Sequence, residues 1–295
     1  MTKRPREVPD EEAREQLVVA ACKRVRVRTV PWANEKGLVS VARHLYNDGT
    51  LQLRRPGQRD AILAVLGPRP PEQVVVVLGT GSGKTLIVMV AASLAGAGTT
   101  VLILPTVALR GNIERESKRV APVVVVSAEA ACTDGFLNYA HRLVDRQQLD
   151  RIVIDECHLT ITASSYRRSI AMLAWHLRQI RTQTVWLTAT LPPVYFDVFV
   201  SHNKLVRPRV VRESTNRANL RYLVQRQSGP GSVAERVLGV MRDCCEREDM
   251  FDRARDRIIV YCPTKEMVDE VARKLGCQSY TAETGTEEKG AVINR

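Results

Sequence analysis

The sequence predicts an α/β fold in which helices cover both faces of a parallel sheet. Two observations predict it: short runs rich in valine and isoleucine recur along the chain and alternate with helix-like stretches, and each run is apolar at nearly every position. Strands that are buried on both faces have this composition. Five such runs belong to one domain and cover residues 74–78, 100–104, 123–127, 151–155 and 184–188.

The stretches between the runs predict the covering helices. Residues 85–95 are apolar almost throughout, which indicates a helix in the core of the domain. Further helix-like stretches cover residues 112–120, 135–148 and 167–180. This alternation of strand and helix is typical of a parallel sheet.

A break divides the chain into unequal parts. A basic N-terminal extension, residues 1–40, precedes the first domain, residues 41–226. The glycine, proline and serine residues of "QSGPGS" (227–232) predict the break. Residues 227–295 then contain two helix-like stretches around a sixth apolar run, residues 257–261, which predicts the start of a second α/β domain.

The composition favours a soluble intracellular protein with no membrane contact. Of the 295 residues, 44% are hydrophobic and 26% are charged, no apolar run approaches the length of a transmembrane helix, and the N-terminus is too charged for a signal peptide. The seven cysteines form no C-x-x-C pair, so neither a zinc site nor a disulfide framework is expected. The basic clusters "KRPR" and "KRVRVR" near the N-terminus favour the nucleus over the cytoplasm.

The net charge of +12 indicates a polyanionic partner. Between Lys204 and Arg226 the chain has seven basic residues and one acidic residue, Glu213. Such a local excess suits a phosphate backbone. The alternative is a solvated linker with no partner.

The glycine-rich stretch "LGTGSGKTLI" (78–87) predicts a phosphate-binding loop. It joins an apolar strand to an apolar helix, and its glycines allow backbone N–H groups to converge on phosphate oxygens at the start of that helix. Lys84 supplies a positive charge for the outer phosphates and Thr85 a hydroxyl for Mg²⁺. The alternative is a simple glycine turn, since Leu78 stands where the general pattern has its first glycine. The candidate nucleotide-binding residues of this loop are Gly79, Thr80, Gly81, Ser82, Gly83, Lys84 and Thr85.

A second functional segment, "RIVIDECHL" (151–159), ends an apolar strand with two adjacent acids. Ligands of open α/β sheets bind at this end of the strands. Asp155 is placed to hold the magnesium ion and Glu156 to polarise a water molecule, so Lys84, Asp155 and Glu156 are the candidate catalytic residues. The alternative is a solvated acidic turn.

The order of "GTGSGKT", "IDECH" and "LTAT" (187–190) resembles motifs I, II and III of the superfamily-two helicases of the DExH kind. More narrowly, the chain resembles the RecQ family of DNA helicases. "LRRPGQRDAI" (53–62) is similar to that family's motif zero, in which a glutamine reads adenine, a role that carries over to Gln58. Further similar segments lie at residues 101–113 (motif Ia), 124–130 (motif Ib), 216–224 (the end of the first motor domain) and 258–276 (motif IV).

The resemblance implies a RecA-like sheet domain followed by the beginning of a second RecA-like domain, with ATP and Mg²⁺ as cofactors. It also implies movement, of 3′–5′ polarity, on single-stranded or partly duplex DNA in repair or recombination. His158, Thr188 and Thr190 would couple the nucleotide site to the DNA. The candidate DNA-binding residues by motif position are Thr106, Arg110, Ser127 and Asn219.

The chain also departs from the family. In RecQ proteins, the loop that follows the DExH box and senses DNA is rich in aromatic residues. In this chain, residues 159–170 contain a single aromatic residue, Tyr166. Counterparts of motifs V and VI are not found in the 295 residues, so a protein partner that supplies second-domain elements is expected if the chain is active. The alternative is an ATP- and nucleic-acid-binding helicase remnant without unwinding activity. An unrelated small-molecule kinase is disfavoured, because it needs no adenine-reading Gln58 ahead of the loop.

Overall fold

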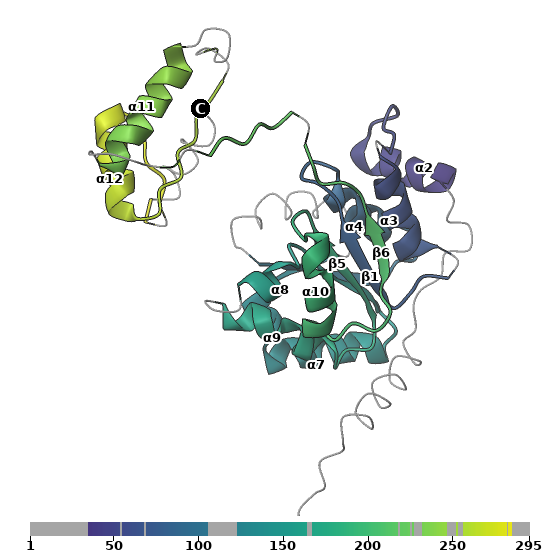
Figure 1. Cartoon of the computed structure of the whole chain (residues 1–295). Coiled ribbons are helices and arrows are strands. Elements are labelled where there is room, and N and C mark those ends of the chain that lie inside the picture. The colour runs from purple at the N-terminus through teal and green to yellow at the C-terminus, as the bar shows by residue number, and fades with distance from the viewer. Residues whose placement is uncertain are drawn as a thin grey trace, which may run out of the picture. The chain divides into compact units, whose positions relative to one another are not determined.

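The chain forms two compact units, Met1–Asn219 and Leu220–Arg295. They are described separately and are drawn in Figure 1. The division lies just ahead of the predicted break at 227–232. The computed structural model describes residues 35–53, 55–67, 69–105, 123–163, 167–217, 219–224, 226, 232–246, 252, 256–281 and 283–284.

The first unit is built on a six-stranded sheet in which every neighbouring pair is parallel. The strands lie in the order β3-β2-β4-β5-β1-β6. This confirms the predicted α/β fold class. The strands are β1 (Gln73–Val77), β2 (Thr99–Leu104), β3 (Val123–Ser127), β4 (Leu149–Ile154), β5 (Gln183–Thr188) and β6 (Arg209–Arg212).

Strand β6 was not predicted. It lies in the basic run that the sequence assigned to a polyanion contact, and only Val211 of its four residues is buried. It pairs with β1 at the edge of the sheet, with Val211 opposite Val76. A strand that is half charged and four residues long lacks the apolar signal by which the other five were found.

Two apolar cores lie on the two faces of the sheet. Along β1, Val74 and Val76 belong to one core and Val75 and Val77 to the other, as the alternation of side chains in a strand requires. Helices α2 (Glu35–Tyr46), α3 (Pro56–Leu66) and α4 (Lys84–Ala92) cover the first face. The second face is covered by α6 (Ala128–Ala131), α7 (Asp134–Asp145), α8 (Leu159–Thr162), α9 (Arg168–Leu177) and α10 (Phe196–His202), with the 3₁₀ turn η2 (Pro193–Tyr195) before α10.

In the first unit, the predicted strands and helices that fall within the described residues agree closely with the observed ones. Residues 35–40, assigned to the N-terminal extension, form the first half of α2, and Leu38 is buried in the core. Residues 1–34 and the expected helix at 112–120 lie outside the described residues. No helix within the described part of the chain has the length and apolar character to cross a membrane.

One charged side chain is fully buried in the sheet. Arg151 of β4 donates from Nη1 to the carbonyl oxygen of Ala91 and to Thr100 Oγ1, both at 3.0 Å. Its Nη2 lies 3.9 Å from Asp150 Oδ2, which also accepts a hydrogen bond of 2.7 Å from the Gly98 N–H. Ala91 is in the last turn of α4, where the helix dipole favours a cation. Arg151 therefore connects β4 to β2 and to the C-terminal end of α4.

The second unit contains two described helices that pack on each other, α11 (Val233–Glu246) and α12 (Lys265–Leu275). Thr264 caps α12 through its Oγ1, and Gly276 ends the helix with a φ of 63°. Residues 257–261, which were predicted to be a strand, form neither a strand nor a helix and have no strand partner among the described residues, and Tyr261 is 90% exposed. A strand requires a neighbour for its backbone groups, and the described residues of this unit provide none.

The Arg151 contacts predict the cost of removing this side chain. Arg151→Ala should lower the free energy of unfolding by about 3 to 5 kcal/mol, because it leaves the buried Asp150 carboxylate without its cation. Urea unfolding would measure the change. Arg181→Ala, at an exposed position, is the matched control and should change stability by less than about 0.5 kcal/mol. Equal stability of the two variants would contradict a structural role for Arg151.

Candidate nucleotide-binding site

The glycine-rich loop follows β1 at the carboxyl edge of the sheet. Gly81 and Gly83 have φ values of 76° and 79°, which lie in the left-handed region that favours glycine. The Ser82 N–H donates to the Gly79 carbonyl oxygen at 3.2 Å, so the loop turns back on itself before α4 begins at Lys84. The N-terminus of an apolar helix thus lies at the end of the loop, as phosphate binding requires.

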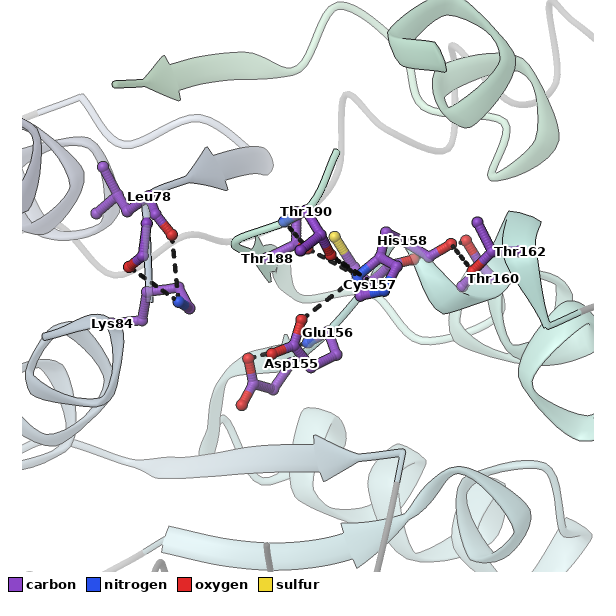
Figure 2. A network of polar contacts seen from close by, with 11 residues as sticks. Leu78, Lys84, Asp155, Glu156, Cys157, His158, Thr160, Thr162, Thr188 and Thr190 are labelled. Carbon is purple, nitrogen blue, oxygen red and sulfur yellow. Dashed lines mark hydrogen bonds and ion pairs between the residues drawn. The ribbon is translucent and has the colours of Figure 1, made fainter. Parts of the chain in front are cut away.

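Lys84 points back into this loop. Its Nζ donates to the carbonyl oxygens of Leu78 (3.2 Å) and Gly79 (3.4 Å), as Figure 2 shows. Ser82 is buried, and its Oγ has no hydrogen-bond partner among the described residues. Thr80 is exposed and Thr85, in the first turn of α4, is half-buried. The cation, the unsatisfied buried hydroxyl and the helix N-terminus together fit the phosphates of a nucleotide.

Gln58 reaches the same loop from α3. Its side chain is buried, and Nε2 lies 3.4 Å from the Gly83 carbonyl oxygen in donor geometry. A Cβ atom on Gly83 would lie 2.2 Å from this Nε2. Gly83 is therefore required both by its backbone conformation and by the close approach of Gln58. The sequence predicted that Gln58 lies at the nucleotide site, and the structure brings it to the loop.

The two acidic residues follow β4 at the same edge of the sheet. Asp155 Oδ1 accepts a hydrogen bond of 2.9 Å from the Glu156 N–H. Glu156 has a φ of 47°, an uncommon conformation for a residue with a side chain. The residues on both sides of Glu156 are bonded to neighbouring strands through their backbone. The Asp155 N–H donates to the Ile103 carbonyl oxygen of β2 at 3.0 Å, and the Cys157 N–H donates to the Leu187 carbonyl oxygen of β5 at 2.9 Å. These bonds hold the turn, and with it both carboxylates, in a fixed position.

The surroundings shift the two carboxyl groups in opposite directions. Burial, with the neighbouring negative charge of Glu156, raises the pKa of Asp155. A hydrogen bond from His158, whose Nδ1 lies 3.4 Å from Oε2, lowers the pKa of Glu156. The positive charge of Lys84 acts on both groups and favours their ionised forms. Opposite shifts in adjacent acids indicate different chemical roles.

His158 joins this turn to the "LTAT" segment, as Figure 2 shows. Its Nδ1 lies 2.8 Å from Thr188 Oγ1 and 3.0 Å from Thr190 Oγ1. The Thr190 N–H also donates to Thr188 Oγ1 at 3.1 Å. The three residues predicted to couple the nucleotide site to the rest of the protein therefore form one hydrogen-bonded cluster next to Glu156.

Residues 55–198 match the family model of the DEAD/DEAH box helicases. The match contains the glycine-rich loop, the acidic turn and the threonine segment. Residues 55–198 are therefore similar to a DEAD/DEAH box helicase domain, and we refer to them below as the helicase domain. A domain of this family binds ATP, which agrees with the chemistry of the loop.

Two relatives confirm the resemblance to RecQ helicases. The chain is 26% identical over 292 residues to "ATP-dependent DNA helicase Q5" of Mus musculus, covering 86% of this chain and 29% of the relative. It is 27% identical over 277 residues to "Putative ATP-dependent DNA helicase Q1" of Caenorhabditis briggsae, covering 83% of this chain and 42% of the relative. The chain thus spans less than half the length of these relatives.

Solved helicases have the same fold. The structure of the DUF1998 helicase MrfA bound to DNA gives a TM-score of 0.57 at 14% identity, covering 92% of this chain and 44% of MrfA. The Mycobacterium smegmatis helicase Lhr bound to ssDNA and AMP-PNP gives a TM-score of 0.53 at 17% identity, covering 86% and 39%. At these identities the likeness shows the fold alone.

The structure describes two of the four candidate DNA-binding residues. Ser127, the last residue of β3, caps α6 by accepting a hydrogen bond of 3.1 Å from the Ala130 N–H. Asn219 is exposed and accepts from Arg217 Nε at 3.4 Å. Thr106 and Arg110 lie outside the described residues, as does Tyr166. A DNA contact at each of the four residues stays a prediction.

The sequence did not predict the contacts that support the acidic turn and the residue next to Gln58. Thr160 Oγ1 donates to the Cys157 carbonyl oxygen (2.9 Å) and accepts from Nδ2 of the fully buried Asn203 (3.0 Å). Glu213 Oε1, beyond β6, accepts from the Gly57 N–H at 2.5 Å, one residue from Gln58. Both contacts join residues far apart in the chain, and no local pattern marks them.

The raised pKa of Asp155 predicts a stability change in the helicase domain. An acid whose pKa is raised on folding destabilises the fold once it ionises, so the penalty is absent well below the ordinary pKa of 3.8 and present at neutral pH. Asp155→Asn keeps the Oδ1 acceptor and removes the charge. It should raise the melting temperature at pH 7 by about 2 to 4 °C, for a gain on the order of 1 kcal/mol.

Thermal unfolding at pH 7 and at pH 3 would measure this effect, and the difference between variant and wild type should disappear at the lower pH. Asp134→Asn, on the surface of α7, is the control. A variant that is less stable than the wild type at pH 7 would show that the Asp155 carboxylate stabilises the fold.

Proposed function

We propose that this chain is an ATP-dependent DNA helicase or translocase of RecQ type, which couples ATP hydrolysis to movement on single-stranded DNA in repair or recombination. The observation that supports it is the arrangement at the carboxyl edge of the sheet. The phosphate-binding loop, two carboxyl groups with opposite pKa shifts, and the His158 cluster lie together there. The proposed hydrolysis site is thus hydrogen-bonded through His158 to the "LTAT" segment, which would transmit the state of the nucleotide to the rest of the protein.

Each part of the site has a role in the proposal. The backbone of residues 79–85 and the Lys84 ammonium hold the phosphates, Gln58 the adenine, and Thr85 and Asp155 the magnesium ion. ATP and Mg²⁺ supply the phosphoanhydride bond and the cation that neutralises charge on it. The burial of Asp155 suits a carboxylate that gains a cation as partner, because a neighbouring positive charge favours its ionised form.

Glu156 is the residue that would orient and deprotonate water. The hydrogen bond from His158 keeps its carboxylate ionised and fixes one oxygen, Oε2. The carboxylate also accepts a hydrogen bond from Thr188, and a water molecule would bind at its remaining acceptor positions. Because His158 also bonds Thr188 and Thr190, a movement of Glu156 would change the contacts of both threonines.

The DNA partner is inferred from the relatives. Both curated relatives are named as DNA helicases, and MrfA and Lhr were solved bound to DNA. Single-stranded or partly duplex DNA, 3′–5′ polarity, a protein partner that supplies further second-domain elements, and a nuclear location belong to the proposal. Thr106, Arg110, Ser127 and Asn219 are its proposed DNA contacts. The Ser127 hydroxyl accepts a hydrogen bond from the Ala130 N–H in the cap of α6, and its own O–H would donate to a phosphate oxygen.

Lys84 should dominate nucleotide affinity. Lys84→Ala removes a charge-assisted hydrogen bond to the phosphates and should weaken ATP binding by about 10- to 100-fold. Titration with a fluorescent ATP analogue would measure this. Lys36→Ala, exposed on α2, is the control and should bind as the wild type does. Unchanged affinity in the Lys84 variant would contradict the assignment of the loop.

Glu156 should control turnover and not binding. Glu156→Gln keeps the size of the side chain and should leave ATP affinity within about twofold, while ATP hydrolysis falls by about 10² to 10⁴. Hydrolysis should be measured with and without single-stranded DNA, with Lys84→Ala as the inactive control. Stimulation by DNA supports the helicase proposal. ATP binding with no DNA-stimulated turnover would instead support the remnant that binds ATP and nucleic acid without unwinding.

A further inference from the structure

The edge of the sheet opposite the nucleotide site has a row of exposed arginines. Arg181, Arg69 and Arg207 precede β5, β1 and β6, three strands that are neighbours in the sheet. All three strands run in the same direction, so these residues lie at the amino edge, whereas the glycine-rich loop and the acidic turn lie at the carboxyl edge. We call this row, together with its basic neighbours Arg146, Arg178 and Lys204, the basic edge.

The loops of the basic edge are bonded to one another. The Val206 N–H donates to Gln73 Oε1 at 2.7 Å, which joins the loop before β6 to the start of β1. The Thr184 N–H donates to the Glu72 carbonyl oxygen at 2.8 Å, and Gln183 Nε2 donates to the Pro71 carbonyl oxygen at 3.0 Å. These bonds fix the three loops relative to one another, so the three arginines project from one rigid frame.

The charges of the basic edge are not used within the described protein. None of its six side chains makes an ion pair or a side-chain hydrogen bond with another described residue. The acids on the same loops are Asp145, which is exposed, and Glu72, which is half-buried. The edge therefore presents a net positive row to its surroundings.

Backbone conformation gives a second observation. Arg207 and Lys204 have φ values of 47° and 51°, in the region that glycine or asparagine adopts with less strain. Lys204 lies just after a helix, whereas Arg207 precedes a strand, so the basic side chain at position 207 indicates that its charge has another use. Helix C-termini attract cations, which alone accounts for Arg146, Arg178 and Lys204 next to α7, α9 and α10. It does not account for Arg69, Arg181 and Arg207, which precede strands.

We propose that the basic edge binds the phosphate backbone of duplex DNA. Neighbouring strands are about 4.8 Å apart, so β5 and β6, on either side of β1, lie about 10 Å apart. The arginines lie two to four residues ahead of these strands, on a width comparable to the major groove of B-DNA, about 12 Å. Arginines on a rigid row of this length reach phosphates on both sides of one groove. This contact lies on the sheet edge opposite the ATP site, so duplex DNA bound there leaves that site accessible.

The residues favour duplex over single-stranded DNA. Proteins that bind single strands stack the bases on aromatic side chains, and the loops that carry the basic edge, residues 69–72, 146–148, 178–182 and 203–208, contain no aromatic residue. Backbone contacts from arginine alone position a protein on DNA without reading its sequence. The basic edge would therefore hold the helicase domain on the duplex part of a substrate, independent of base sequence.

The inference is tested by duplex binding without nucleotide. The edge variant Arg69→Gln/Arg181→Gln/Arg207→Gln and the control Lys36→Gln/Arg242→Gln/Arg273→Gln lose the same three charges, the latter from exposed positions on α2, α11 and α12. Fluorescence anisotropy with a short labelled duplex at several salt concentrations gives affinity and its salt dependence. The full chain is used, and each variant is compared with the wild type by thermal unfolding.

In the edge variant, the slope of log affinity against log salt should be smaller in magnitude by roughly 2 to 3, about 0.9 for each phosphate contact. Its affinity at low salt should fall at least about 10-fold below that of the control. If the triple variant unfolds, Arg181→Gln alone should reduce the slope by about 0.9. Equal slopes and affinities in edge and control variants would overturn the proposal and leave the edge to an acidic protein or to solvent.

The same assay separates this inference from the proposed function. In a Lys84→Ala background the duplex affinity should be unchanged, because no nucleotide takes part. ATP hydrolysis by the edge variant without DNA should equal that of the wild type. A loss of single-stranded DNA binding as large as the loss of duplex binding would also overturn the assignment of duplex DNA.

Discussion

All six strands of the first unit run in one direction, and this constraint decides where each functional side chain lies. The glycine-rich loop follows β1 and the acidic turn follows β4, so both lie at the carboxyl edge although about 70 residues separate them in the chain. The "LTAT" segment begins in the last two residues of β5 and continues beyond it, and β5 lies between these two strands. A single directional sheet thus gathers three segments of the helicase domain at one edge.

The acidic turn is held from several sides. Backbone bonds join it to β2 and β5, and Asn203 supports it through Thr160. This support maintains Glu156 in its left-handed conformation, which would otherwise relax. The same turn keeps the buried Asp155 carboxyl group next to a second acid, which is unfavourable for stability. Function at this edge therefore depends on a conformation and a charge distribution that the rest of the domain stabilises.

Sequence patterns predicted the parts of the molecule that have a local signal. The five apolar strands, the glycine-rich loop, the acidic turn and the residues of the His158 cluster were each visible within a few residues of chain. Strand β6 was missed because it has only two valines, with an arginine on each side, and Arg151 gave no sign that its charge is buried in the core. The contacts of Asn203 and Glu213 depend on the order of the strands, which no single stretch of sequence determines.

The hydrogen bonds of Lys84 within the loop affect how the loop would bind a ligand. Its ammonium is bonded to the carbonyl oxygens of Leu78 and Gly79, so the protein itself provides hydrogen-bond acceptors for this cation. In the proposed function, phosphate binding would be an exchange of acceptors at Lys84 within a loop that is already folded. Little conformational entropy is lost in such an exchange, and the cation stays solvated by protein at every stage. The lysine that would bind the phosphates therefore also stabilises the folded shape of the glycine-rich loop.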